Sequence, residues 1–217
     1  MSEGKKTKNT LVHDALILFA ITIIAAVALG FVYEITKEPI AKAQVQAKID
    51  AYKSVFPGME STDDAVNTEL SKFQAMIDAD PELTGTTVDE VLTACDGNGK
   101  SLGWVMTLSN SKGYGGSITI TLGITDQPGP DEVVSLNGIE FLSISETAGL
   151  GMKAKNDEFK GQFTNAKLNR YSLTKRNISG DVEVDAISSA TITTTAVTRM
   201  VDAGLKIGSY LAGRSSN

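Results

Sequence analysis

The sequence is poor in the side chains that bind metals and form disulfides. Its 217 residues include one cysteine, Cys95, and one histidine, His13. An iron–sulfur cluster needs about four cysteine or histidine ligands, so this chain is not expected to hold one unaided. Zinc sites and histidine-based triads lack their residues too, and one cysteine cannot form an internal disulfide. We expect Cys95 to be a half-buried thiol at a strand end. Any redox role must therefore use an organic cofactor.

Positive charge is also in short supply. The chain has 20 lysine and arginine residues against 26 acidic residues, a formal net charge of −6. Proteins that bind nucleic acid usually carry a basic patch or stripe, and none is visible here. No nucleic-acid partner is expected. Neighbouring acidic residues such as Asp63 and Asp64 are interpreted as surface charge, not as a catalytic pair.

One long hydrophobic run stands out near the N-terminus. From Ala15 to Tyr33 the chain is apolar apart from Thr22. A helix needs about 20 such residues to cross a bilayer, so the run predicts a transmembrane helix over 15–33. It carries no ionisable residue at its centre, and nothing in it indicates an ion path.

The charges beside this run predict its orientation. Lys5, Lys6 and Lys8 precede it, and the positive-inside rule then places residues 1–14 in the cytoplasm and the rest outside the membrane. The alternative is a cleaved signal peptide, with the small residues 26–28 as its cleavage site. The apolar run continues beyond them to Val32, which favours a retained anchor in the cell (inner) membrane.

The remainder predicts a helical linker over 34–58, ending at the turn Pro57-Gly58, and one α+β domain over 59–217. Within the domain we expect a mainly antiparallel sheet with flanking helices. A short helix is predicted around Leu70, Phe73 and Ile77, and another over 157–163. The predicted strands are 87–94, 102–109, 117–124, 132–137, 138–144 and 182–185. Trp104, within a strand pattern, is expected in the core.

A final amphipathic helix is predicted near the C-terminus. Val197, Met200, Val201, Leu205 and Leu211 recur at helical spacing, with two glycines, at 204 and 208, on the same face. We expect the helix to begin near residue 194, with a hydroxyl among residues 193–195 capping its free N–H groups. Such a helix end suits a phosphate group.

Four short motifs then follow one another in a meaningful order. The segment Asp185-Ala-Ile-Ser-Ser-Ala-Thr191 resembles the Asp-x-x-(Ser/Thr)-Gly-Ala-Thr signature of proteins that carry FMN as a phosphodiester on the last threonine. Upstream stand Gly113-Tyr-Gly-Gly116, Glu146-Thr-Ala-Gly-Leu-Gly151 and Gln162-Phe163. Together they resemble the G-type subunit of Rnf complexes and the homologous C-type subunit of the sodium-pumping NADH:quinone reductase. Two residues depart from the family pattern: Ala148 replaces a proline and Ser189 replaces a glycine.

The resemblance implies a cofactor and its site. FMN would be attached covalently to Thr191 by a flavin transferase that uses FAD, so Thr191 would be an acceptor and the chain would have no catalytic residue. Glycines in the upstream motifs would let the backbone approach a planar ring. The other residues expected around the cofactor are Ser188, Ser189, Ala190, Thr193, Thr194, Glu146, Thr147, Gly149, Leu150 and Tyr114.

The resemblance also implies a function. The chain would be the electron-relay subunit of a membrane Rnf complex, a ferredoxin:NAD oxidoreductase coupled to sodium or proton translocation, with the other membrane subunits as partners. The first alternative is the C-type subunit of the sodium-translocating NADH:quinone reductase; the short connection between anchor and domain favours Rnf. An alternative of another class is a membrane-anchored, extracytoplasmic ligand-binding module without a redox role.

Overall fold

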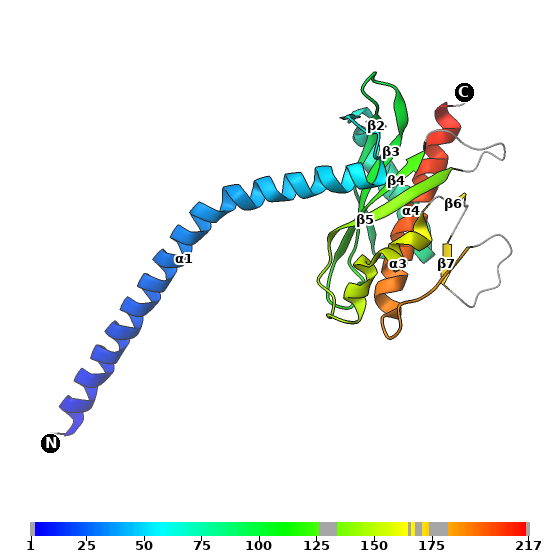
Figure 1. Cartoon of the computed structure of the whole chain (residues 1–217). Coiled ribbons are helices and arrows are strands. Elements are labelled where there is room, and N and C mark those ends of the chain that lie inside the picture. Colours follow the sequence, from blue (N-terminus) through cyan, green and yellow to red (C-terminus); the bar gives the residue numbers. More distant parts are fainter. Residues whose placement is uncertain (1–2, 126–133, 165, 168–170, 174–181, 216–217) are drawn as a thin grey trace. The chain divides into compact units, whose positions relative to one another are not determined.

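The protein is described here by a computed structural model that covers residues 3–125, 134–164, 166–167, 171–173 and 182–215 (Figure 1). The chain divides into two compact units, Met1–Ala47 and Lys48–Asn217. Part of the predicted strand over 132–137 lies outside the described residues.

The first unit is helical throughout its described part. It belongs to helix α1 (Glu3–Val55), which includes Pro39 in its interior. Within Leu11–Val55, an 18-residue window has a mean hydropathy of 2.8 and no buried residue, enough by length and composition to cross a membrane. The predicted helix over 15–33 is confirmed as an apolar helix. The predicted linker does not form a separate element, because α1 continues through it to Val55.

The second unit contains the predicted antiparallel sheet. Its six strands follow one another in chain order, each antiparallel to the next. Side chains alternate between the two faces of each strand, so that Ile118, Ile120 and Leu122 are fully buried. The α+β fold class is thereby confirmed. The strands are β1 (Ser61–Asp63), β2 (Thr86–Cys95), β3 (Ser101–Asn110), β4 (Ile118–Thr125), β5 (Ser135–Ser143) and β6 (Ala166–Lys167).

Strand β5 corrects one expectation. The sequence predicted two strands that meet at Gly138, but Gly138 lies inside a single strand and pairs with Gly123 of β4. The register shifts between Gly123 and Ile124. A glycine within a strand often marks such an irregularity and does not end the strand.

Short elements complete the second unit. Helix α2 (Leu70–Asp78) buries Phe73 and Ile77 as predicted, and helix α3 (Asp157–Lys160) leads into the short helix η4 (Gly161–Phe163). The predicted strand β8 (Val182–Val184) is present, and it pairs in parallel with β7 (Tyr171–Leu173), which was not predicted. The remaining turns of 3₁₀ helix are η1 (Ala65–Glu69), η2 (Pro81–Leu83) and η3 (Gly151–Lys155).

Both faces of the sheet are covered. Helix α4 (Thr191–Ser215) runs behind the strands in Figure 1 and packs against β3 and β4, in a core that includes Trp104, as predicted. On the opposite face, Tyr52, Val55 and Phe56 pack with β2 and β3 residues. Cys95 is partly buried at the end of β2, also as predicted. Because α4 packs against β3 and β4, the sheet sets the position of the first residues of α4. The predicted cofactor site lies at these residues.

Candidate functional site

The chain enters α4 through a tight turn from Ile187 to Ala190. The Ala190 N–H donates to the Ile187 carbonyl oxygen at 2.9 Å. Ser189 has φ 60°, and among the described residues it is the only one other than glycine with a positive φ. This conformation favours glycine, because a side chain crowds the following carbonyl. A glycine at position 189, as in the motif that this segment resembles, would therefore fit the turn better than serine does.

Helix α4 begins three residues earlier than predicted, at Thr191. Thr191 is exposed at its first position. The N–H groups of the first turn have no acceptor within the helix, and the helix dipole places positive potential there. The start of α4 can thus receive an anion beside the Thr191 hydroxyl.

The predicted capping role of Thr193 and Thr194 is wrong. Both residues lie in the first turn of α4 and are buried, with 1% and 0% of their surface exposed. The Thr194 hydroxyl donates to the Ala190 carbonyl at 3.0 Å and accepts from the Ile187 N–H at 3.1 Å. Threonine inside a helix commonly bonds a carbonyl four residues earlier in this way.

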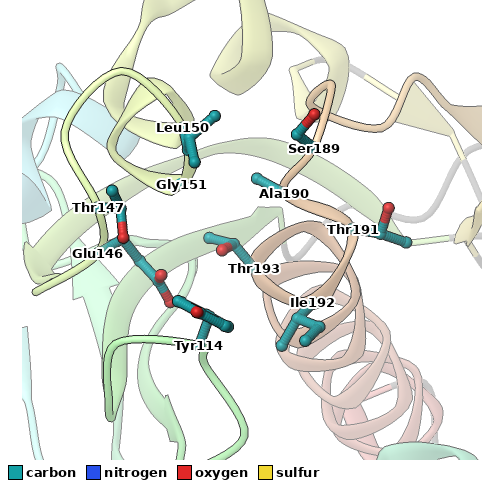
Figure 2. Close-up of a pocket in the computed structure, with 10 residues that line it drawn as sticks. All are labelled: Tyr114, Glu146, Thr147, Leu150, Gly151, Ser189, Ala190, Thr191, Ile192 and Thr193. Atoms are coloured by element: carbon teal, nitrogen blue, oxygen red, sulfur yellow. The ribbon is translucent and has the colours of Figure 1, made fainter.

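A pocket of about 520 Å³ lies between the start of α4 and the loop that carries Glu146. This volume is typical of sites for small molecules and cofactors. Figure 2 shows Thr147 and Glu146 on one side, Thr191 and Ile192 on the other, and Tyr114 below. Segments far apart in the sequence thus meet at one site. Its lining residues are Tyr114, Glu146, Thr147, Leu150, Gly151, Ser189, Ala190, Thr191, Ile192 and Thr193.

Glu146 is the charged side chain in this wall. It is 9% exposed, and its Oε2 accepts a hydrogen bond from the Gly115 N–H at 3.2 Å. Its Oε1 is buried without a hydrogen-bond partner among the described residues. An unsatisfied buried carboxylate oxygen is costly, so this oxygen lacks a hydrogen-bond donor that the described residues do not supply.

The glycines of the motifs serve contacts within the protein. A Cβ at Gly115 would lie 2.1 Å from the Ser145 carbonyl oxygen, and a Cβ at Gly151 would lie 2.7 Å from the Thr193 Oγ1. Both positions therefore require glycine for packing. These two glycines make room for the neighbouring protein segments, and Gly151 also lines the pocket, so their predicted place beside a planar ring stays a prediction.

Three predicted residues do not line the pocket. Thr194 is buried, and Gly149 is absent from the wall, although its φ of 77° gives its loop a turn that favours glycine. Ser188 lines a neighbouring cavity of about 290 Å³ with Gln162 and Asp185, whose backbone N–H donates to the Gln162 Oε1.

Sequence reasoning also missed one wall residue, Ile192, which is 52% exposed. Ile192 stands between Thr191 and Thr193 of the motif, and this position was the sequence feature that could have predicted its place in the wall. Tyr114 reaches the same pocket while 73% exposed.

Comparison with known proteins identifies two regions. Residues 113–206 match the model of the FMN-binding domain family, and residues 1–55 match that of the RnfG N-terminal region. The first range contains all the residues that line the pocket.

Full-length relatives agree. The G subunit of the proton-translocating ferredoxin:NAD(+) oxidoreductase complex of Clostridium ljungdahlii is 32% identical, over 85% of this chain and 88% of the relative. The G subunit of the Na(+)-translocating complex of Acetobacterium woodii is 29% identical, over 88% of each chain. The crystal structure of NqrC from Shewanella oneidensis is 20% identical and covers 57% of this chain and 60% of that chain with a TM-score of 0.45, too low to carry any assignment. The family predicted from the motifs is confirmed: the chain belongs to the RnfG family, the G subunits of Rnf complexes, and contains an FMN-binding domain.

Proposed function

We propose that this chain is the electron-relay subunit of a membrane Rnf complex and carries FMN covalently on Thr191. The observation that carries the proposal is the pocket in which the start of α4 faces Glu146, with Thr191 exposed at its edge (Figure 2). FMN supplies reversible electron-transfer chemistry when bound. The part left to the protein is to hold and orient it.

The residues present fit such a cofactor. The first-turn N–H groups of α4 would receive the phosphate. Glu146 Oε1 is buried and without a partner among the described residues, so a rotation of this side chain toward the pocket would let it accept from a flavin N–H or O–H. Leu150 and Ile192 are 40% and 52% exposed at the pocket, so they offer apolar surface to a ring system.

Attachment would use Thr191 as an acceptor. Its Oγ1 forms an ester bond to the flavin-side phosphorus of FAD, the phosphate–phosphate bridge breaks and AMP leaves. The hydroxyl proton passes to a base of the flavin transferase. The chain needs no catalytic residue for this step, and a covalent cofactor cannot be lost outside the cytoplasm.

We also propose where the chain lies in the cell and how it is oriented in the membrane. The apolar helix and the family support a membrane-anchored subunit. The lysines at 5, 6 and 8 favour a cytoplasmic N-terminus and an extracytoplasmic domain. The partners would be the other membrane subunits, and the coupling ion sodium or protons, since both occur in the names of relatives. Protease added to protoplasts should cut the domain, and full protection there would contradict this orientation.

Attachment is tested by mass spectrometry of the peptide containing residues 188–199 from native membranes. The wild-type peptide should be heavier by the mass of FMN less water. Thr191→Ala should lose the flavin, and its free energy of unfolding should stay within about 0.5 kcal/mol of wild type, because it alters an exposed side chain. Thr195→Ala is the matched control: its hydroxyl bonds only the Thr191 carbonyl, at 2.7 Å, among the described residues, and it should keep the flavin. An unmodified wild-type peptide would reject covalent attachment.

A further inference from the structure

We propose that Thr194 is a positioning residue for flavin attachment, because its buried hydroxyl holds the Ile187–Ala190 turn closed and so presents Thr191. The inference rests on the proposed role of Thr191 as acceptor. Thr194 is 0% exposed and absent from the pocket wall, so it does not contact a cofactor in the pocket. The proposed role of Thr194 is instead to hold the turn.

One side chain joins both ends of the turn. Thr194 Oγ1 accepts from the Ile187 N–H at 3.1 Å and donates to the Ala190 carbonyl at 3.0 Å. The Thr194 backbone N–H donates to the same carbonyl, also at 3.0 Å. Since the Ala190 carbonyl belongs to the peptide unit that enters Thr191, this hydroxyl fixes the backbone on which the acceptor stands.

The turn needs such support because of Ser189. Its φ of 60° is unfavourable for a residue with a side chain, and the turn's own hydrogen bond, from Ala190 to Ile187 at 2.9 Å, spans it. Without the hydroxyl, the partly buried Ile187 N–H loses its acceptor. The turn would then open more often, and Thr191 would spend less time where the transferase must reach it. The chemistry is unchanged: Thr191 Oγ1 still bonds to the flavin-side phosphorus as AMP leaves.

The sequence offers a matched control four residues further along α4. Thr198 is also buried, at 5% exposure, and its hydroxyl donates to the Thr194 carbonyl at 2.9 Å. This bond lies within the helix and not at the turn, so Thr198→Val removes a buried hydroxyl of the same helix and leaves the turn intact. Thr194→Ser is the conservative variant, because it keeps the hydroxyl.

The test uses the full chain with the flavin transferase in its membrane. The modified fraction of the 188–199 peptide is measured early in expression, together with hydrogen exchange at the Ile187 and Ala190 amides. We expect Thr194→Val to lower the early modified fraction about tenfold and to speed exchange at both amides. Thr194→Ser and Thr198→Val should behave as wild type in both measurements.

A further variant separates positioning from general stability. If Thr194 supports the strained turn, adding Ser189→Gly to Thr194→Val should restore much of the attachment, even where the single variant accumulates poorly. Normal attachment in Thr194→Val, an equal loss in Thr198→Val, or no restoration by Ser189→Gly would each overturn the proposal. An unmodified wild-type peptide would instead reject the role of Thr191, and this inference with it.

Discussion

Gly204 of α4 lies directly against Leu122 of β4. A Cβ at Gly204 would be 2.7 Å from both Leu122 Cδ atoms, closer than real Cβ contacts allow. The same holds for Gly208, where a Cβ would be 2.9 Å from Ile124 Cδ1. These two glycines therefore allow close packing, and they set how near α4 comes to the sheet.

Gly204→Ala should consequently destabilise the protein. Alanine favours the helix by about 1 kcal/mol over glycine, but forcing a methyl group into a packed core typically costs about 1–3 kcal/mol. We expect a net loss of up to about 2 kcal/mol in the free energy of unfolding, measured with urea. Gly213→Ala is the control, since a Cβ there meets no atom within 4 Å; it should be neutral or stabilising. Equal effects of the two substitutions would contradict the packing argument.

Ser189→Gly should stabilise the domain. It relieves the positive φ of 60°, a gain of about 1 kcal/mol, partly offset by the greater freedom of glycine in the unfolded chain. Ser188→Gly gives the unfolded chain the same extra freedom but relieves no backbone strain, because Ser188 is not among the residues with positive φ. Urea unfolding of the two variants should therefore differ in sign, and attachment in Ser189→Gly should match or exceed wild type. A lower stability for Ser189→Gly than for Ser188→Gly would count against strain in the turn.

The raised pKa of Tyr52 predicts that the stability of the fold falls at alkaline pH. Its hydroxyl donates to Glu90 and lies 3.1 Å from the Thr107 hydroxyl. Burial, and next the Glu90 hydrogen bond, raise the pKa of Tyr52 well above its ordinary value of 10.0. The folded state thus keeps the proton that the unfolded state releases, so this contribution to stability is full below about pH 10 and falls as pH rises above it.

Tyr52→Phe should lose about 1 kcal/mol at neutral pH, as expected for a lost hydrogen bond, and should lose less further stability than wild type above about pH 10. Unfolding by urea at neutral pH and at several more alkaline values measures both effects. Parallel alkaline losses in the two proteins would show that Tyr52 ionises as easily in the fold as outside it.

Lys160 anchors α3 to the sheet through Glu140. Their Nζ and Oε2 atoms are 2.8 Å apart, and the two side chains are 19% and 24% exposed. Burial alone would lower the pKa of Lys160, but the hydrogen bond and charge of Glu140, and next those of Asp157, outweigh it, so the net pKa is raised. The pair therefore stabilises the fold below the unfolded lysine pKa of about 10.4 and loses this effect as pH rises through the folded pKa.

Lys160→Met should lower the free energy of unfolding by about 1 kcal/mol at neutral pH, the upper end for partly exposed pairs. The difference from wild type should shrink above about pH 11. Lys155→Met, at an exposed lysine, adds the same apolar side chain and should stay within about 0.5 kcal/mol of wild type. A Lys160→Met deficit that is constant across this pH range would point to lost packing in place of the ion pair.

Local patterns accounted for most of the fold. The apolar run, the alternation over 118–124 and the helical stripe from Val197 to Leu211 each reflect the geometry of one element, so they predicted that element correctly. The β5 strand was divided at Gly138 because a glycine reads as a break until its partner Gly123 is known. The parallel pairing of β7 with β8 likewise left no local pattern.

The same division holds at the site. By itself the sequence determined the family, the membrane-length helix and the threonine motif, since each is written in adjacent residues. Only the tertiary structure decided that Glu146 faces the start of α4, that Gly115 and Gly151 serve packing, and that Thr194 bonds the turn. The hydrogen bond between Gly115 and Glu146, for example, joins residues that are 31 positions apart in the sequence. The geometry of such contacts depends on how the sheet brings loops together, a property that no short segment contains.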